Sequence, residues 1–337
     1  MKNILITGGL GYIGSHTAVE LLAAGHNVII VDNLCNTKLN ILDNIKAISG
    51  KEPKFYQIDV NDTEVLTEIL ASENIDSIIH FAALKSVGQS ILQPTQYYQN
   101  NIGGLLSLIS AAEQTGTRNL IFSSSATVYG AENPSPVSED APIGKALNPY
   151  GQTKIMGEQI LTDLSLSDET WNITLLRYFN PVGSHESGLL GDDPSLPPTN
   201  LMPILMRAAS GELPEVQIFG DDYPTKDGTA VRDYIHVTDL ARGHIAALNN
   251  PKTGIKIYNL GTGNGYSVKK IIETFKDVNN LKLNVKMAPR RDGDLDVSYS
   301  NPSKAEKELG WKANLSLDEM CKSAWEFYRK TNSFVFR

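Results

Sequence analysis

A tyrosine and a lysine lie four positions apart near the middle of the chain, at Tyr150 and Lys154. Asn148 and Pro149 precede them, and a capping asparagine followed by a proline is typical of a helix N-terminus. The spacing therefore predicts that both side chains lie on one face of a helix, one turn apart. A protonated lysine beside a phenol favours the phenolate. We therefore expect a lowered pKa at Tyr150, which would let the phenol exchange a proton near neutral pH.

A second pair at the same spacing, Tyr266 and Lys270, shows that spacing alone is a weak signal. We expect Tyr150 to be the functional tyrosine because it follows an apolar run over residues 120–123 and a serine-rich loop. The carboxyl ends of parallel strands are where ligands bind in such folds. Ser125 in that loop could donate a hydrogen bond to a substrate hydroxyl, or it could simply be the polar end of a strand.

A glycine-spaced turn follows the first apolar run of the chain, which reads MKNILIT and continues as GGLGYIGS. Gly8 suits a tight turn, Gly11 lets the main chain approach a pyrophosphate, and Gly14 lets the following helix pack against the strand. The N-terminus of that helix would face phosphates with free N–H groups and the positive end of its dipole. The spacing is G-x-x-G-x-x-G, whereas most dehydrogenases have G-x-G-x-x-G, and this indicates one branch of the Rossmann proteins.

The surroundings of these glycines favour a nucleotide site over a turn that only packs a helix on a strand. Residues 12–24 have an amphipathic helical pattern closed by Gly25, and residues 27–31 form an apolar strand that ends at Asp32. Asp32 lies 18 residues after Gly14. This is close to the roughly 20 residues expected before a carboxylate that binds an adenosine ribose diol. Because a carboxylate repels a ribose phosphate, we expect NAD and not NADP. Oxidised nicotinamide would also favour the Tyr150 phenolate.

Strand and helix patterns alternate over the first half of the chain. They cover residues 54–59, 63–71, 76–83, 94–116, 119–125, 149–166 and 172–179. Such alternation predicts an α/β fold with right-handed crossovers and a doubly wound parallel sheet of the Rossmann type. Residues 181–203 are rich in Pro, Gly and Asp, which is typical of a long loop. We predict an NAD-binding domain over 1–180, with a return segment near 232–250, and a smaller mixed α/β substrate domain over 181–337.

The composition excludes several classes of protein. Residues are 41% hydrophobic and 20% charged, and a net charge of -8 without a basic block argues against a nucleic-acid or membrane partner. Cys35 and Cys321 are too few for a disulfide framework or a zinc site, and the histidines form no H-E-x-x-H, so we expect no metal. The first strand begins directly after Met1 and Lys2 without a cleavable leader pattern, so we predict a cytoplasmic protein.

Motifs along almost the whole chain resemble one family. They read TGGLGYIGSH, DNLCN, HFAALKSVGQS, FSSSATVYG, NPYGQTK, LLRYFNPVGSH, NLMP, GTAVRDYIHVTDLA, YNLGTG and APRRDGDL. In this order and at this spacing, from Lys2 to about Glu326, they are similar to the UDP-glucose 4-epimerase family, a branch of the extended short-chain dehydrogenases/reductases. The resemblance implies a homodimeric isomerase of galactose metabolism. It would invert carbon 4 of UDP-hexoses by transient hydride transfer to tightly held NAD, through a 4-keto sugar.

The same resemblance implies roles for single residues. Tyr150 would be the acid/base, Lys154 its electrostatic partner and a nicotinamide-ribose ligand, and Ser125 a hydrogen-bond donor to the reacting oxygen. With the glycine turn (Gly8, Gly11, Gly14), positions that match NAD ligands are Tyr12, Ile13, Asp32, Asn33, Asn36, Asp59, Val60, Phe81, Lys85, Asn100, Tyr150, Lys154 and Tyr178. Positions that match substrate ligands are Ser125, Tyr150, Asn180, Asn200, Leu201, Phe219, Arg232, Arg291, Asp294 and Ser298. Arg232 and Arg291 suit a diphosphate because a guanidinium offers paired donors, although either could equally form a surface ion pair.

Ser298 bears on the breadth of the substrate range. Its position matches the family site beside the substituent on carbon 2 of the hexose. Members restricted to UDP-glucose and UDP-galactose have a tyrosine there, whereas members that also accept N-acetylated sugars have a small residue. Because serine leaves room for an N-acetyl group, the resemblance implies activity on UDP-N-acetylglucosamine and UDP-N-acetylgalactosamine as well. If the register slips by one, Tyr299 would fill that space instead.

Two other functions share part of this pattern. Sugar-nucleotide 4,6-dehydratases and decarboxylases resemble the chain in fold, NAD and the Tyr/Lys pair. A dehydratase places Asp-Glu after its Ser or Thr, where this chain has Ala126 and Thr127, which cannot serve as the acid and base of dehydration. An NAD-sensing regulator built on the same domain would not need Tyr150, Lys154 and Ser125. We therefore favour an epimerase.

Overall fold

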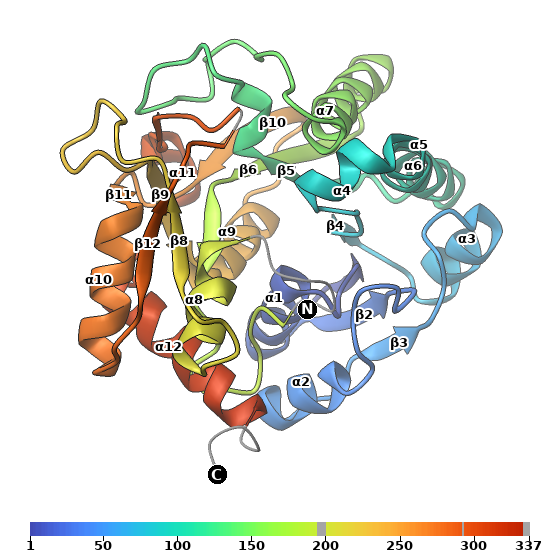
Figure 1. Ribbon diagram of the computed structural model, residues 1–337. Coiled ribbons are helices and arrows are strands. Elements are labelled where there is room, and N and C mark those ends of the chain that lie inside the picture. The colour runs from blue at the N-terminus through green and yellow to red at the C-terminus, as the bar shows by residue number, and fades with distance from the viewer. Residues whose placement is uncertain (194–199, 292, 333–337) are drawn as a thin grey trace.

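The computed structural model describes residues 1–193, 200–291 and 293–332 (Figure 1). The strands are β1 (Asn3–Thr7), β2 (Asn27–Val31), β3 (Lys54–Tyr56), β4 (Ser77–His80), β5 (Asn119–Ser125), β6 (Asn172–Tyr178), β7 (Asn180–Val182), β8 (Val216–Phe219), β9 (Val231–His236), β10 (Gly254–Leu260), β11 (Gly265–Ser267), β12 (Val285–Ala288) and β13 (Val297–Ser298). The helices are α1 (Tyr12–Ala23), α2 (Ile41–Ser49), α3 (Thr63–Ser72), α4 (Val87–Leu92), α5 (Pro94–Tyr98), α6 (Gly104–Thr115), α7 (Pro149–Ser167), α8 (Leu201–Ala209), α9 (Val237–Asn249), α10 (Val268–Asn279), α11 (Ser303–Leu309) and α12 (Leu317–Thr331).

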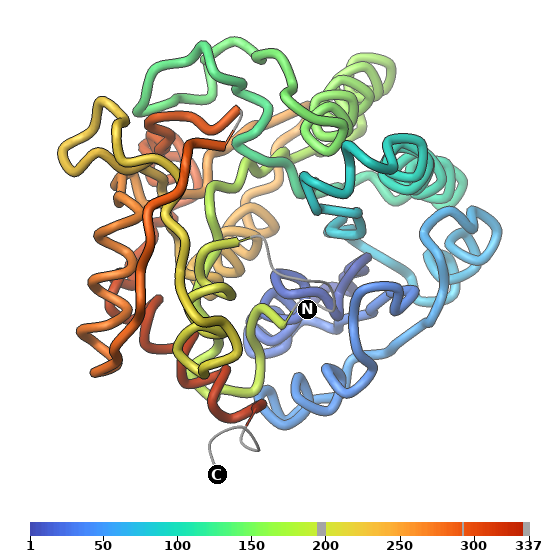
Figure 2. The backbone as a smooth tube through the Cα atoms, viewed as in Figure 1, coloured from blue at the N-terminus to red at the C-terminus, as the bar shows by residue number. Residues whose placement is uncertain are grey.

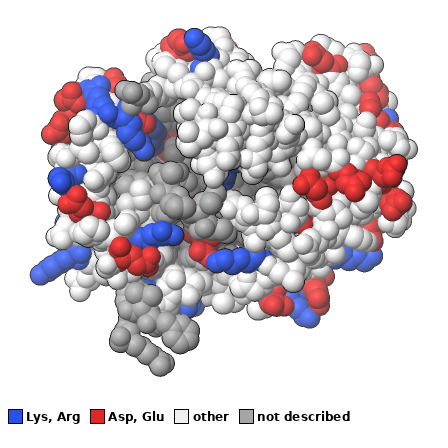
Figure 3. Space-filling model, turned by 45° about the vertical axis from the view of Figure 1, so that its right-hand side comes forward, with Lys and Arg blue, Asp and Glu red and all other residues white. Residues whose placement is uncertain are grey.

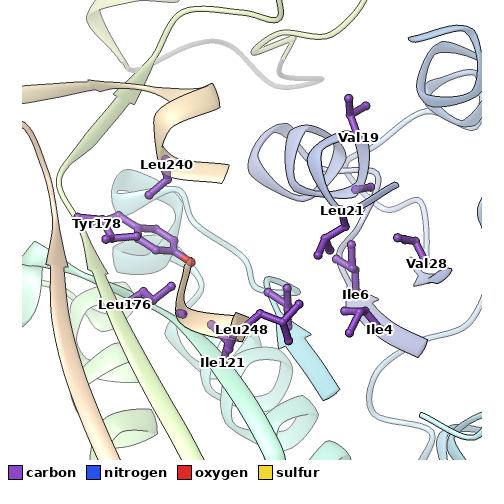
Figure 4. Packing of buried hydrophobic residues seen from close by; sticks show 14 of the residues in the cluster. Ile4, Ile6, Val19, Leu21, Val28, Ile121, Leu176, Tyr178, Leu240 and Leu248 are labelled. Carbon is purple, nitrogen blue, oxygen red and sulfur yellow. The ribbon is translucent and has the colours of Figure 1, made fainter. Parts of the chain in front are cut away.

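A seven-stranded sheet in the order β10-β6-β5-β4-β1-β2-β3 forms the larger layer, and its neighbouring strands are all parallel. Successive side chains of a strand point to opposite faces. In β1, Ile4 and Ile6 therefore enter the core under α1, α2 and α9 (Figure 4), whereas Leu5 enters the core under α3, α6 and α7. Burial on both faces explains why these strands are apolar throughout. The predicted doubly wound Rossmann-type sheet is confirmed.

The helix expected over residues 94–116 is interrupted. It consists of α5, a π-helical turn over Gln99–Gly103, and α6. The turn carries Asn101, whose side chain accepts from the backbone N of Leu84 at 2.8 Å and donates to the Leu84 carbonyl oxygen at 3.0 Å. A π-helix is rare and occurs mostly as a single turn within an α-helix, which is too short for a sequence pattern to indicate.

A smaller layer is built around β9, which pairs with β7 and β13 in parallel and with β11 antiparallel. Figure 2 shows the backbone of β8 and β12 running side by side, and these two strands form a separate parallel pair. Helices α8, α10 and α12 pack around a common apolar core in this layer. The long loop expected over 181–203 is shorter at both ends, because β7 pairs with β9 and α8 begins at Leu201; residues 194–199 lie outside the described residues.

The second half of the chain also contributes to the larger layer. Helix α9, which lies within the predicted return segment near 232–250, packs beside α1 on one face of the large sheet. Strand β10 follows α9 and forms the edge of that sheet beside β6. The two predicted domain ranges remain a proposal, and the chain crosses between the layers more than once.

Candidate active site

The carboxyl ends of the parallel strands carry many of the side chains predicted to bind a cofactor. Positions at or just after these ends are Gly8 (β1), Asp32 (β2), Asp59 (β3), Phe81 (β4), Ser125 (β5) and Tyr178 (β6). Because the strands are parallel, these positions lie along one edge of the sheet. The strand order reverses between β1 and β4, and ligands of doubly wound sheets bind at such a point.

The glycine turn is closely packed against its surroundings. Gly8 has φ +69°, and a Cβ on it would lie 2.8 Å from the backbone N of Ala82. A Cβ on Gly14 would lie 2.4 Å from the carbonyl oxygen of Gly8, so α1 can begin directly against the turn only with glycine there. The N-cap of α1 is Gly11, which has no side chain to bond the first-turn N–H groups. These groups are available for a phosphate, so the turn fits the pyrophosphate of a dinucleotide.

Asp32 is buried at the end of β2 and held by three donors. Its carboxylate accepts from the backbone N of Leu10 in the glycine turn at 3.1 Å, from that of Leu34 at 3.0 Å and from the Thr37 hydroxyl at 2.8 Å. A carboxylate accepts about four hydrogen bonds, so Asp32 retains capacity for a ribose hydroxyl. Both its position and its orientation fit the adenosine end of NAD.

The predicted acid/base pair lies on α7 as expected. The Asn148 side chain caps this helix by accepting from the backbone N of Gly151 at 2.9 Å, with a proline in the first turn. Tyr150 and Lys154 share one face, with the lysine Nζ 5.9 Å from the centre of the phenol ring. Ser125, at the end of β5, lies close enough to the Tyr150 phenol for its hydroxyl to oppose the rise in the pKa of Tyr150. The structure therefore brings the three predicted catalytic residues together.

The pKa of Tyr150 differs from the expectation that Lys154 lowers it. Burial raises the pKa of Tyr150 to about 12, although the hydrogen bond with Ser125 opposes this. Burial also lowers the pKa of Lys154 to about 8, against the attraction of Glu158. The Lys154 ammonium donates to the carbonyl oxygen of Ser123 at 2.6 Å, and its Nζ lies 5.9 Å from the centre of the phenol ring. The expectation was wrong for these side chains alone, because it left desolvation out.

Residues predicted to hold the substrate gather on the smaller layer. Ser298 is the direct register partner of Arg232 on the neighbouring strand. Asp294 lies between two guanidiniums, 3.7 Å from Arg232 Nη2 and 2.8 Å from Arg291 Nε. Arg291 also lies over the ring of Phe219, at 4.9 Å. Each arginine thus forms an ion pair, but one carboxylate balances only one of two positive charges, and the remaining charge suits a diphosphate.

Other predicted ligands lie at the rim of these layers. Asn200 is exposed at the N-cap of α8 without bonding it, next to Leu201, and Asn180 is exposed on β7. Lys85 Nζ lies 3.8 Å from an Asp192 oxygen and 5.9 Å from the ring centre of Tyr12. Of the remaining predicted ligands, Val60 is buried, and Ile13 and Asn36 are partly buried. The Asn33 side chain donates to Asp59 at 2.9 Å, and Asn100 in the π-helical turn donates to Asn101.

The second tyrosine and lysine at the same spacing do not form a comparable pair. Tyr266 lies on β11, whereas Lys270 lies in the first turn of α10, whose N-cap is Ser267. The tyrosine packs against the apolar core of the smaller layer. The two side chains therefore do not share a helix face, and Tyr150 remains the predicted catalytic tyrosine.

Sequence reasoning missed His244, which lies on α9. The Nδ1 atom of this buried ring is 2.8 Å from the carbonyl oxygen of Leu240 and therefore carries a hydrogen, and burial lowers the pKa of the ring to about 4. The neutral ring leaves Nε2 as an acceptor for the Tyr178 hydroxyl. Burial also raises the pKa of Tyr178, so its proton stays on the phenol. No local spacing connects these residues, and only the fold brings them together.

Within residues 1–193, 200–291 and 293–332, no group of three or more His, Cys, Asp or Glu side chains is arranged to hold a metal ion. The helices of the same residues include none that is long and apolar enough to span a membrane.

The parallel sheet carries a glycine turn that fits a dinucleotide, and Ser125, Tyr150 and Lys154 lie close together. These features define a nucleotide-dependent Rossmann enzyme. The chain belongs to the NAD dependent epimerase/dehydratase family, which it matches over residues 4–261. UDP-glucose 4-epimerase of Bacillus subtilis (strain 168) is 50% identical over 326 residues, 96% of each chain. A crystal structure of UDP-glucose-4-epimerase from Stenotrophomonas maltophila with bound NAD and formylated UDP-arabinopyranose has a TM-score of 0.97 and 46% identity, covering 99% of this chain and 100% of that one. The enzyme from Bifidobacterium longum in complex with NAD+ and UDP has a TM-score of 0.94 and 48% identity, with coverages of 98% and 99%.

Asp32 should set the choice of nucleotide. We expect denatured wild-type protein to release NAD and not NADP, because the buried carboxylate accepts from a ribose diol and repels a 2'-phosphate. Asp32→Asn should reduce the preference for NAD over NADP by about tenfold or more, since a hydrogen bond to a charged group contributes about 1.5–3 kcal/mol. Chromatography of the released nucleotide and titration with both dinucleotides measure this. Release of NADP from the wild type, or equal affinity for both, would refute the role.

Proposed function

We propose that the chain is a UDP-hexose 4-epimerase that interconverts UDP-glucose and UDP-galactose in galactose metabolism. The observation that carries the proposal is that Ser125, Tyr150 and Lys154 lie together at the same edge of the sheet as the glycine turn. The residues after Ser125 are Ala126 and Thr127. Neither can supply the acid and base that dehydration needs, so the site favours epimerisation within its family.

In the proposed mechanism, the chain's residues move one proton and orient the hexose. When bound, oxidised NAD supplies the hydride acceptor for carbon 4 and a positive charge that lowers the pKa of a nearby phenol. Tyr150 takes the proton of the 4-hydroxyl and later returns it. Ser125 donates to the reacting oxygen, since its own Oγ already accepts from the backbone N of Thr127 at 3.3 Å. Lys154 stabilises the phenolate as a nearby ammonium.

Inversion requires that the keto sugar present its other face while the nucleotide stays in place. Arg232 and Arg291 are proposed to hold the diphosphate, about which the sugar turns. Asp294 accepts a hydrogen bond from Arg291 Nε at 2.8 Å and lies 3.7 Å from Arg232 Nη2, so part of the side-chain ordering precedes binding. We therefore propose that the site holds the diphosphate firmly and the hexose loosely.

Ser298 supports a broader substrate range. Its backbone pairs with that of Arg232, whereas the next residue, Tyr299, packs its ring beside Gly265 of β11. Successive side chains of a strand point to opposite faces, so Tyr299 is turned away from the face that Ser298 occupies. The small serine leaves room beside carbon 2 of the hexose. We therefore propose that UDP-N-acetylglucosamine and UDP-N-acetylgalactosamine are also interconverted.

We further propose a cytoplasmic homodimer. No charged residue occurs between Lys85 and Glu113, the stretch that forms α4, α5 and α6. Exposed apolar side chains in this stretch include Ile91 at 60%, Leu92 at 80% and Leu106 at 49%. Figure 3 brings this side of the molecule forward and shows a broad area without charged side chains. A second copy of the chain would cover it, and the free thiols of Cys35 and Cys321 are consistent with a reducing compartment.

The function and its breadth can be tested together by NMR. Wild-type protein without added cofactor should convert UDP-galactose to UDP-glucose and UDP-N-acetylgalactosamine to UDP-N-acetylglucosamine. Ser298→Tyr should lose only the second activity, because the larger ring would occupy the space of the N-acetyl group. Activity of the wild type on UDP-galactose alone would refute the role of Ser298, and inactivity on both pairs would refute the proposed function.

Tyr150→Phe should reduce kcat on UDP-galactose by about 10² to 10⁴-fold, the usual contribution of a general acid/base. Nucleotide and UDP-sugar binding should change little because only the proton-transferring oxygen is removed. Tyr266→Phe is the matched control and should leave turnover nearly unchanged. If the Tyr266 variant were the more damaged of the two, the assignment of the acid/base would be wrong.

The dimer should be visible by sedimentation equilibrium as twice the chain mass at micromolar concentration. Leu92→Glu should shift the protein toward monomers, because it places a charge on an exposed apolar side chain of α4. Leu166→Glu should also shift the protein toward monomers, since Leu166 is 78% exposed at the end of α7. A wild-type protein that sediments as a monomer would contradict this part of the proposal.

A further inference from the structure

Three consecutive serines of β5 contact three successive turns of α7. Ser125 lies beside the Tyr150 phenol, and the Ser123 carbonyl oxygen accepts from Lys154 at 2.6 Å. The Ser124 hydroxyl donates to Glu158 at 2.5 Å, and Glu158 lies one turn beyond the lysine. Residues at this spacing lie on one helix face. The strand end therefore holds the acid/base, its ammonium partner and one further carboxylate in a single row.

Glu158 is also fixed from the neighbouring strand. Arg177 on β6, the register partner of Ser124, donates from Nε at 2.9 Å and from Nη2 at 2.7 Å to the two oxygens of Glu158. The side chains of Arg177 and Glu158 are only 3% and 7% exposed. A buried ion pair contributes little net stability compared with apolar residues of similar size. The arrangement around Glu158 thus calls for a role besides stability.

We infer that Glu158 is a positioning residue of the proposed epimerase reaction. Held by Ser124 and Arg177, it fixes α7 against β5 and keeps a negative charge one turn from Lys154, so that this lysine remains an ammonium beside Tyr150. The inference rests on the proposed function for the reaction itself. The contacts of Glu158 with Ser124 and Arg177 that support the inference, however, do not depend on the proposed function.

The other groups around Lys154 do not replace this charge. On α7, Tyr150 is a neutral phenol, and on β4, His80 is neutral because burial lowers its pKa to about 3. The ring of Phe122 on β5 lies 4.9 Å from the lysine Nζ. On β6, Arg177 is positive and directs its donors to Glu158. Of these neighbours of Lys154, Glu158 alone is a carboxylate, and its charge supports the ammonium.

The sign of the expected pH effect follows from these neighbours. Burial lowers the pKa of Lys154 to about 8, and the charge of Glu158 opposes that change. Without the carboxylate, the pKa of Lys154 falls further, and the ammonium is lost as pH rises through a lower value. Loss of kcat should therefore begin at lower pH, while the rate at more acidic pH is less affected.

We expect Glu158→Gln to move the alkaline limb of kcat on UDP-galactose by about one pH unit downward, which is about tenfold more loss at high than at low pH. KM should change little. Glu158→Asp keeps the charge and should keep the wild-type pH profile at a reduced kcat. The E158Q/R177M double variant leaves no unpaired buried arginine, so it should fold and shift the alkaline limb in the same direction as E158Q.

A matched control is the ion pair of Arg118 with Asp168, 3.3 Å apart, which joins the other ends of the same strand and helix. Asp168→Asn should leave both kcat and the pH profile unchanged, even if the thermal midpoint falls. If Asp168→Asn produced the shift of E158Q, the effect would be one of helix anchoring and the inference would be overturned.

A measurement without turnover separates this inference from the proposed function. In protein labelled with ¹³C at the lysine ε-carbon, the Lys154 resonance is assigned by its loss in Lys154→Met. It should titrate at lower pH in E158Q/R177M than in the wild type. An unchanged midpoint would overturn the inference whether or not the protein is an epimerase. A shifted midpoint in a protein that fails to epimerise would refute the proposed function alone.

Discussion

A buried ammonium is the constraint on which the rest of the site depends. Lys154 is 5% exposed, so its charge must be balanced inside the protein or be lost. The Ser123 carbonyl oxygen, the face of Phe122 and the carboxylate of Glu158 provide that balance. Glu158 is itself buried and requires Arg177, which in turn lies over the ring of Tyr129 at 4.8 Å. One charge needed for chemistry thus determines a row of residues on three elements.

The same network reaches the layer that is proposed to hold the substrate. The Tyr129 hydroxyl donates to Asn259 of β10 at 2.6 Å, and the Asn259 amide donates to the carbonyl oxygen of Val137 at 2.9 Å. The Val137 carbonyl oxygen also accepts from the backbone N of Asn301 at 2.8 Å, shortly after β13. Every buried polar group in this series has a partner, and satisfied networks of this kind favour one arrangement over alternatives. The catalytic helix and the segment just after β13 are therefore connected through one cation–π contact and a series of hydrogen bonds.

The sequence allowed the large sheet to be predicted because its signals are local. Apolar runs, capping residues such as Asn148 and the glycine turn each describe a few neighbouring positions, and the strands predicted between residues 3 and 178 are found where expected, although α2 and α4 were not predicted. The π-helical turn could not be predicted, because a single turn over Gln99–Gly103 is too short to leave a distinct periodicity in the sequence. His244 could not be predicted either, since its partner Tyr178 is distant in the sequence. The direction of the Tyr150 pKa required burial, which composition and spacing do not report.

The raised pKa of Tyr150 has a chemical use. A phenol that holds its proton in the absence of a nearby positive charge releases it when such a charge enters the site, and binds it again when the charge is neutralised. When bound, NAD would supply such a positive charge, and its reduction would remove that charge. The pKa of Tyr150 would therefore rise at the step in which the substrate 4-hydroxyl gives up its proton. Lys154 supplies a constant charge that keeps both states accessible, and it can do so only while Glu158 keeps it protonated.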